Sequence, residues 1–448
     1  AELSRQLQGS VRVNPPELAR ALQENLDVEQ VVWLGEPPAG EDAAVTAQRL
    51  AVQALLGVQA LLGHPPQRLL FVTWSAVAVQ SGDPVQVQGA PLWGFGRSVM
   101  QEHPELGCTL VDLSSGQASI QSVLRELTWV DEETQVAWRD GHRYVARLVR
   151  AQPGPRKDPP NFSHSSTVLI TGGLGALGLQ VGRWLAEQGV GHLVLTGRRG
   201  LDSPGAKDAV AQLQGLGTRV TVAAADVTDR RALAEVLAAI PAQQPLCAVV
   251  HAAGVLDDGV LSEQSPDRFE RVLGPKVSGA WNLHELTAAL PLHSFVLFSS
   301  VAGLLGAAGQ SNYAAGNAFL DALAAHRQSQ GLAAQSLSWG PWAQGGMAAA
   351  LGGAAQQRLA RQGYKALGTE QARKLWTEGQ QRSEAQLGAF ELELAAVARR
   401  LGAPVPPLWR NLLSSPEARA QSVQKGTWAE QLLKQEPEQR LLQVRAAV

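Results

Sequence analysis

Several residue types are scarce in this sequence, and each shortage excludes a class of protein. Only two cysteines, Cys108 and Cys247, occur among 448 residues. They lie far apart in apolar surroundings, so we expect buried thiols in a reducing compartment rather than a disulfide framework. There is no apolar run of about eighteen residues, and no charged leader followed by an apolar stretch. We therefore expect a cytoplasmic protein without a membrane partner.

An excess of charge of either sign is also missing. The chain has 38 Lys and Arg against 40 Asp and Glu, which gives a formal net charge of −2. Such a nearly equal number of positive and negative charges produces no strong electrostatic field, which argues against a nucleic-acid partner. The residues that are present, 45% hydrophobic and 17% charged, are typical of a globular chain, and the length suits two or three domains.

The order of apolar runs predicts two α/β regions joined by a linker. Residues 1–150 end in a predicted hairpin at 134–149 with the turn Arg139-Asp140-Gly141, and residues 151–166 are a polar, proline-containing linker. The second region is assigned to residues 167–400, and from about Thr167 to Gly345 its β-branched runs alternate with helical patterns, which predicts a Rossmann-like, doubly wound parallel sheet. The predicted strands are 167–171, 192–196, 219–223, 248–252, 294–299 and 334–339. After about Met347 we expect only helices, with residues 401–448 as a helical tail.

The first region resembles a shortened copy of the second. Residues 71–78 match residues 295–302, and residues 31–35 match the stretch from 249 to 254. Residues 11–22 match the stretch from 220 to 237, and the three matches fall in the same order. We interpret residues 1–150 as a truncated duplicate that begins at its third strand. The alternative is that two unrelated α/β folds share similar apolar strands.

A glycine-rich turn follows the first strand of the second region. Gly173, Gly175 and Gly178 have the G-x-G-x-x-G spacing, and the helix that follows offers free N–H groups to a pyrophosphate. Arg198 and Arg199 follow the next strand, where an NAD enzyme would carry an acid. Guanidinium groups suit a 2′-phosphate, so we predict NADPH as the cofactor; the alternative is a solvated basic turn. The other predicted cofactor contacts are Ala176, Leu177, Asp226, Val227, Ala252, Ala253 and Gly254.

Four polar residues are candidates for the reaction itself. Tyr313 and Asn317 are four residues apart in a predicted helix and share one of its faces. Ser300 follows a strand, at the edge where open parallel sheets place their active sites. A phenol has an ordinary pKa of about 10, so a proton-donating tyrosine needs a nearby cation that lowers it. Lys276 is the candidate cation, and we predict that these side chains converge.

These motifs resemble the ketoreductase domains of modular polyketide synthases, within the short-chain dehydrogenase/reductase superfamily. The resemblance rests on the glycine turn, on His251-Ala-Ala-Gly-Val and on the four polar residues, and it covers nearly the whole chain. Asn317 stands where other superfamily members carry their lysine, an exchange typical of these ketoreductases. Residues 1–150 resemble the family's inactive structural subdomain, in which Ala76 replaces Ser300 and the reacting groups are missing. We expect this copy to act as a brace.

The resemblance implies a role for each candidate. Tyr313 donates a proton to the substrate carbonyl oxygen, and Ser300 hydrogen-bonds the same oxygen. Lys276 tunes the tyrosine, and Asn317 holds a relay water. The substrate is a β-ketoacyl chain on the phosphopantetheine of an acyl carrier protein, and the other partners are domains of the same synthase module.

The resemblance also implies a stereochemical type. Leu256, Asp257 and Asp258 match the Leu-Asp-Asp signature of B-type ketoreductases, which form the D-configured β-hydroxyl. Leu305 stands in place of the A-type tryptophan, and Ala308 in place of the proline associated with epimerised substrates, so a B1-like enzyme is implied. The alternative for the two acids is a solvated loop or a helix cap. The other residues expected on the substrate side are Gln310, Trp342 and Met347, of which the last two suit core packing equally.

The sequence also bears on other possible functions. Residues 427–448 resemble the helical linker that leads to a carrier protein, but they contain no carrier-type Asp-Ser-Leu motif. An inactive ketoreductase kept as a scaffold and a free-standing dehydrogenase of small alcohols are the two alternatives. We expect no metal site, because residues 284–288 lack the second histidine of a zinc-protease helix. Residues 309–313 lack the final glycine of a nucleophile elbow, which argues against a serine hydrolase.

Overall fold

The computed structural model describes residue 17 and residues 28–38, 40–114, 119–129, 131–152, 158, 160, 162–345 and 359–414. The chain divides into two compact units. Unit 1 comprises residues 1–145, 153–351 and 366–390, and unit 2 comprises residues 146–152, 352–365 and 391–448. Among the residues described, no helix combines the length and the apolar character that a membrane span needs.

The larger sheet of unit 1 contains seven parallel strands in the order β8–β7–β6–β9–β10–β11–β13. Their bounds are β6 Thr167–Thr171, β7 His192–Gly197, β8 Arg219–Ala224, β9 Leu246–His251, β10 Ser294–Ser300, β11 Gln335–Trp339 and β13 Gln386–Ala389. The order reverses direction beside β6, which is the arrangement of a doubly wound sheet. The predicted fold class is therefore confirmed, and the six predicted strands lie within two residues of the observed ones.

Alternating strand residues supply two cores, one on each face of this sheet. Val168 and Ile170 of β6 belong to one cluster, whereas Leu169 between them belongs to the other. Such near-continuous apolar strands are expected where helices cover both faces. One face carries α6 Ala176–Glu187, α7 Ala206–Gly215 and α15 Thr369–Gln380. The other carries α8 Arg230–Ala238, α9 Pro266–Leu273, α10 Ala280–Thr287 and α12 Ser311–Ser329.

The smaller sheet has five strands in the order β1–β2–β3–β4–β5. Their bounds are β1 Gln30–Leu34, β2 Arg68–Trp74, β3 Cys108–Leu113, β4 Gln135–Arg139 and β5 His142–Val145. The first four are parallel, as in the run β9–β10–β11–β13, and the last two form the predicted hairpin. Asp140 (φ 48°) and Gly141 (φ 78°) both adopt the left-handed conformation that a two-residue hairpin turn requires. The truncated Rossmann-like copy is thus present, while residues 11–16 and 18–22 of its proposed first match lie outside the described residues.

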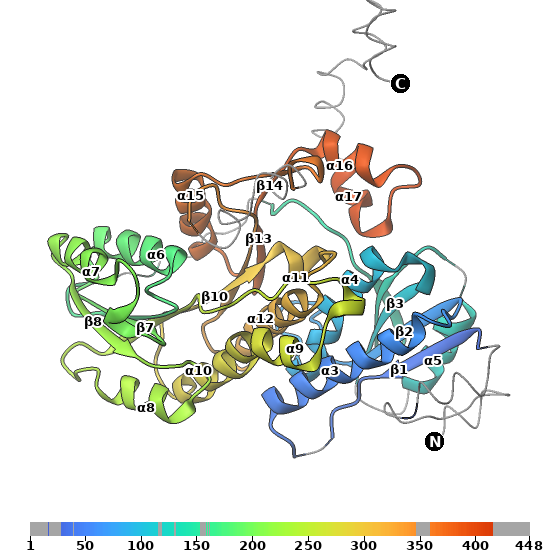
Figure 1. Cartoon of the computed structure of the whole chain (residues 1–448), viewed down its shortest axis with the longest axis horizontal. Helices are drawn as coiled ribbons and strands as arrows, with labels where there is room; N and C mark the ends of the chain where they lie inside the picture. Colours follow the sequence, from blue (N-terminus) through green and yellow to red (C-terminus); the bar gives the residue numbers. More distant parts are fainter. Residues whose placement is uncertain are drawn as a thin grey trace, which may run out of the picture. The chain divides into compact units, whose positions relative to one another are not determined.

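The two sheets share one apolar core. Helices α3 Ala43–Leu61 and α4 Ala90–Glu102 cover one face of the smaller sheet, and α5 Ser119–Thr128 covers the other. Figure 1 shows α3 and α4 beside α9 and α12, between the two sheets. The backbones of α4 and α12 approach so closely that a Cβ on Gly94 would lie 2.0 Å from the Ala314 carbonyl oxygen. Both cysteines are free and buried, as predicted.

The expectation of helices alone after Met347 was wrong. Strand β13 adds a seventh strand to the large sheet, and Trp376 of α15 packs in its core. In unit 2, β12 Tyr364–Lys365 pairs with β14 Glu391–Leu392, followed by α16 Leu394–Leu401 and α17 Arg410–Leu413. Two- and four-residue strands are too short to show an alternating pattern, so periodicity did not reveal them. The predicted linker at residues 427–448 lies outside the described residues.

Candidate active site

The glycine turn joins β6 to α6 in a tight path. Gly175 is the N-cap of α6, and its N–H donates to the Gly172 carbonyl at 3.0 Å. A Cβ on Gly178 would lie 2.4 Å from that same carbonyl oxygen, so only glycine lets the helix begin this close to the strand. The first N–H groups of α6 have no acceptor within the helix and are available to an anion. The turn therefore fits the pyrophosphate of a dinucleotide.

Sequence reasoning missed one glycine of this turn. Gly172 has φ +67°, and a Cβ there would lie 2.7 Å from the Ala253 N atom. Residues with a side chain rarely adopt that backbone conformation, and a side chain at position 172 would also collide with the backbone that follows β9. The Gly172-Gly173 pair directly after a strand was the available signal, but the G-x-G-x-x-G spacing drew attention to Gly173.

The other predicted cofactor residues surround the turn at the carboxyl ends of the strands. Arg198 and Arg199 follow β7 and are exposed, and Gly173 N donates to Thr196 O of that strand at 3.1 Å. The Asp226 carboxylate accepts from Thr228 N at 2.9 Å, while Val227 is buried. Of the remaining predicted contacts, Ala176 and Leu177 open α6, and Ala252, Ala253 and Gly254 follow β9.

The four candidate reacting residues converge, although they come from separate elements. Lys276 lies in the π-helical segment Gly274–Gly279 and Ser300 ends β10, whereas Tyr313 and Asn317 lie in α12. The Lys276 ammonium donates to Phe298 O of β10 at 2.7 Å and lies 5.6 Å from the Tyr313 ring centroid. Ser300 lies close enough to Tyr313 to lower the pKa of its phenol, and Asn317 Nδ2 donates to the Tyr313 carbonyl at 2.8 Å.

The path of Lys276 depends on two neighbours. A Cβ on Gly254 would lie 2.9 Å from Lys276 Cε, so glycine makes room for the lysine side chain. His251 supports the backbone just before Lys276. Its Nε2 bonds to Pro275 O at 3.0 Å and its Nδ1 to Thr171 Oγ1 at 2.7 Å. Since a carbonyl only accepts, Nε2 carries the proton and Nδ1 accepts from the threonine. Burial lowers the pKa of His251 to about 3, which keeps this neutral tautomer.

The protonation of the site differs from the expectation in one respect. Burial raises the pKa of Tyr313, and hydrogen bonding to Ser300 and Asn317 offsets only part of that effect. Burial also lowers the pKa of Lys276 to about 7, although the Asp321 carboxylate opposes this shift. Lys276 is not among the groups that shift the pKa of Tyr313, so the expected lowering of that pKa by its ammonium does not appear in this structure. The Lys276 ammonium lies over the Tyr313 ring and donates to the Phe298 carbonyl. With a pKa of about 7, it loses its proton near neutral pH.

The Leu256-Asp257-Asp258 loop is held by arginines of α9 and by residues before Tyr313. Arg268 Nε donates to Asp257 Oδ1 at 2.8 Å, and Arg271 also pairs with this carboxylate. Gln310 Nε2 donates to Asp258 Oδ2 at 2.8 Å. The charge of Asp258 contributes to the raised pKa of Tyr313, which places this acid near the phenol.

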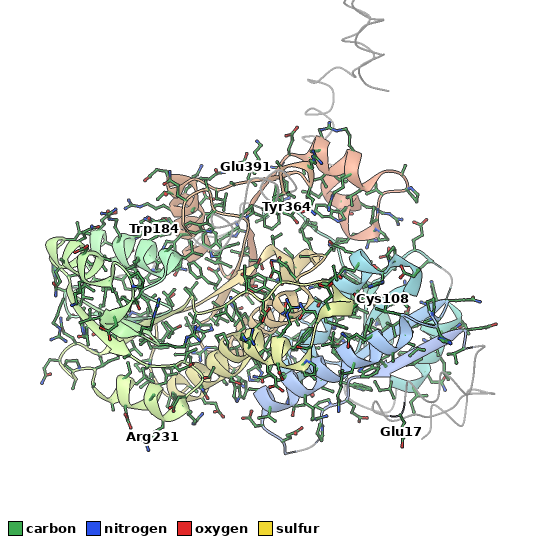
Figure 2. The ribbon with its side chains drawn as sticks, in the orientation of Figure 1. Glu17, Cys108, Trp184, Arg231, Tyr364 and Glu391 are labelled. Atoms are coloured by element: carbon green, nitrogen blue, oxygen red, sulfur yellow. The ribbon has the colours of Figure 1, made fainter. Side chains whose placement is uncertain are left out.

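The remaining predicted substrate residues divide into three groups. Leu305 is buried at the end of α11 Val301–Leu305, and Gln310 is the N-cap of α12. Trp342 lies apart from them in the core on the α6 side, with its ring 5.9 Å from that of Trp184 and 5.1 Å from that of Trp339. Trp184 is labelled in Figure 2. The structure therefore favours core packing for Trp342, and Met347 lies outside the described residues.

Comparison with family models divides the chain at the same place as the two sheets. A model described as "KR domain" matches residues 166–344. A model described as "Polyketide synthase extender module SpnB, Rossmann fold domain" matches residues 2–148.

Known proteins agree with these matches. The chain is 46% identical to polyketide synthase GfsA of Streptomyces halstedii over 357 residues, which are 79% of this chain and 5% of GfsA. It thus spans only a small part of that relative. A solved structure of A-type ketoreductases from a modular polyketide synthase is 37% identical, with a TM-score of 0.81 over 91% of this chain and 86% of the other. The first ketoreductase of the tylosin polyketide synthase is 38% identical, with a TM-score of 0.79 over 91% of this chain and 88% of the other.

Proposed function

The chain belongs to the ketoreductases of modular polyketide synthases, and from that premise we propose that it uses NADPH to reduce a carrier-bound β-ketoacyl thioester to the D-β-hydroxyacyl product. The observation that carries this proposal is the convergence of Tyr313, Ser300 and Lys276 at the carboxyl edge of a sheet whose first turn fits a dinucleotide. An inactive scaffold would not need this arrangement to be intact.

Each of the four candidate reacting residues has a proposed part in the reaction. NADPH, when bound, supplies a hydride to the carbonyl carbon. The Tyr313 hydroxyl donates its proton to the carbonyl oxygen, and Ser300 hydrogen-bonds the same oxygen and orients it. The raised pKa of Tyr313 keeps the phenol protonated at neutral pH, so the donor is loaded before the substrate arrives. An alkoxide is a far stronger base than a phenolate, so the transfer remains downhill.

Reprotonation of the phenolate is assigned to Lys276 and Asn317. A buried amine whose pKa lies near 7 releases and takes up a proton readily at neutral pH. The buried Asn317 Oδ1 has no hydrogen-bond partner among the described residues, which suits an acceptor for a relay water. The proton lost by Tyr313 is thereby replaced by way of Lys276 and the water held by Asn317.

The preference for NADPH rests on Arg198 and Arg199. Both are exposed at the end of β7, beside the turn that fits the pyrophosphate. Two guanidinium groups and no acid at this strand end favour a 2′-phosphate over a free ribose hydroxyl.

The proposed product configuration rests on the loop around Asp257 and Asp258. Similarity over the whole chain does not decide the type, since a solved relative at 37% identity is described as A-type. The local motif supports the proposed type, because Leu256-Asp257-Asp258 is present and Leu305 replaces the A-type tryptophan.

We also propose the division of labour and the partners. Residues 1–150 are the structural subdomain, 151–166 the linker, 167–400 the catalytic subdomain and 401–448 a linker toward the carrier protein. The partners are the acyl carrier protein and the other domains of the module.

The test is an assay with a β-ketoacyl chain on a carrier protein and NADPH. The proposal predicts loss of reduced nicotinamide in equal amount to the β-hydroxyacyl product, and chiral analysis should give the D isomer. No oxidation with any β-keto thioester would favour the scaffold alternative. Activity confined to free alcohols would favour the free-standing dehydrogenase.

A further inference from the structure

Two loops beside the reacting residues lack regular structure of their own. Residues 252–260 connect β9 to the 3₁₀ turn Leu261–Glu263, and residues 306–310 connect α11 to α12. They carry the acids of the Leu-Asp-Asp motif and Gln310. Backbone groups in such loops still need hydrogen-bond partners, so the groups that supply them decide the conformation of the loop.

Helix α4, which covers one face of the smaller sheet, supplies hydrogen-bond partners to α11 and to the start of the second loop. Its side chains bond to successive backbone groups of the catalytic region from Gly303 onward. The pairs are Arg97 Nη1 to Gly303 O (2.7 Å), Gln101 Nε2 to Leu305 O (2.7 Å) and Ala307 N to Ser98 Oγ (3.3 Å). The last turns of α4 thus serve as a template for residues 303–307.

Glu102, the final residue of α4, joins this loop to the first one. Its Oε1 accepts from Gly309 N at 2.8 Å, and its Oε2 accepts from Leu261 N at 2.8 Å. The two loops also meet directly, because Gly259 N donates to Gly309 O at 2.9 Å. A single carboxylate with both oxygens in use therefore fixes the spacing of the loops, and such charged acceptors form the stronger class of hydrogen bond.

Helix α3 supports the same corner from a second direction. Gln59 Nε2 donates to Leu261 O at 3.0 Å and to Gln264 O at 2.8 Å. Gln264 Nε2 in turn donates to Asp257 O at 3.2 Å, and its Oε1 accepts from Asn312 at 3.2 Å. Both α3 and α4, the helices of residues 1–150, therefore hold the segment after Asp258 in place.

We propose that Glu102 is a positioning residue that sets the stereochemical outcome of the reduction. Gly309 precedes Gln310, which bonds to Asp258 at 2.8 Å, so Glu102 fixes the backbone on both sides of that contact. It touches none of the reacting groups and acts only through the two loops. The inference rests on the proposed function, since it assumes that these loops orient a prochiral ketone.

The test compares Glu102→Gln with Glu105→Gln. The glutamine offers one acceptor and turns an NH₂ group toward the second backbone N–H, so one bond is lost. Glu105 is an exposed glutamate three residues further on that pairs with His103, which makes it a matched control. We expect Glu102→Gln to raise the minor alcohol isomer about tenfold, the effect of losing one charged hydrogen bond. NADPH affinity should stay unchanged, and Glu105→Gln should behave as wild type.

Hydrogen exchange makes the test independent of turnover. Peptides covering residues 256–264 and 303–310 should exchange about tenfold faster in Glu102→Gln than in Glu105→Gln. Unchanged exchange would overturn the positioning role, and faster exchange with an unchanged isomer ratio would overturn stereocontrol. If Glu102→Gln does not fold, the milder Glu102→Asp, which keeps the charge but is one methylene too short to reach both backbone N–H groups, is judged by the same two measurements. A wild-type protein that reduces no β-keto thioester contradicts the proposed function instead, and the exchange data still decide the role of Glu102 in the loops.

Discussion

Burial of a lysine is the most consequential feature at the scale of single residues. Lys276 is 3% exposed, and its pKa falls from 10.5 to about 7. At any pH between these two pKa values, Lys276 is mostly protonated in the unfolded chain and mostly deprotonated in the folded chain. The folded state is therefore destabilised progressively as the pH falls through this window, and the effect is complete below about pH 7.

This shift predicts how the stability of the protein depends on pH. Relative to Lys276→Met, the wild-type free energy of unfolding should rise with pH between about 7.5 and 9, by up to about 1.4 kcal/mol per pH unit. Urea unfolding of both proteins across this range measures the difference. Lys374→Met, which removes an exposed lysine of α15, is the control. A difference that does not change with pH would mean that Lys276 keeps its ordinary pKa.

The basic pair after β7 gives a second prediction at this scale. Replacing Arg198 and Arg199 by alanine should weaken NADPH binding about a hundredfold, since two charge-assisted contacts to a phosphate are lost. Binding of NADH should change little. Titration of both dinucleotides, followed by nicotinamide fluorescence, measures the ratio. An equal loss for the two cofactors would show that the arginines act on stability and not on the 2′-phosphate.

At the scale of elements, the contact between α4 and α12 has no room for a side chain at Gly94. Gly94→Ala should lower the free energy of unfolding by about 1–3 kcal/mol, because the new methyl group forces the helices apart. Gly215→Ala in α7 is the matched control, since a Cβ there meets nothing within 4 Å. Thermal unfolding compares them. An equal midpoint for the two variants would contradict the close approach.

The sequence predicted those elements whose pattern is local. β6 and β7 were found because their apolar runs end at clear turns, and the stretch around Tyr313 and Asn317 was correctly predicted as a helix, α12. β13 was missed because four residues carry no period, and Gly388 among them is a poor strand former. The π-helical segment that carries Lys276 depends on tertiary contacts such as the His251 bond to Pro275. The bonds made by Glu102 cross about 160 and 210 residues of sequence, so no local pattern announces them.

At the scale of the whole molecule, the two sheets of unit 1 share one hydrophobic core. Phe71 of β2 and Phe95 of α4 are joined to Phe269 of α9 through ring contacts of 5.8 and 6.0 Å. Because of this shared core, the two sheets cannot separate without exposing apolar side chains to water. The region without reacting groups is thus a structural part of the enzyme, as its interpretation as a brace implies.

The shared core predicts joint unfolding of the two sheets. Native-state hydrogen exchange in increasing denaturant should give the same opening free energy for core amides of β2 and β3 as for those of β9 and β10. Gly94→Ala should lower all of them equally. Earlier opening of the smaller sheet by several kcal/mol would show that it folds as an independent domain.

The proposed reaction depends most on the phenol of Tyr313, and one paired measurement tests this directly. NADPH affinity and turnover of a carrier-bound β-ketoacyl thioester are determined for the wild type, for Tyr313→Phe and for the control Tyr144→Phe in β5. We predict unchanged affinity for all three and a loss of turnover of about 100- to 10,000-fold in Tyr313→Phe alone. Wild-type turnover by Tyr313→Phe would contradict the account.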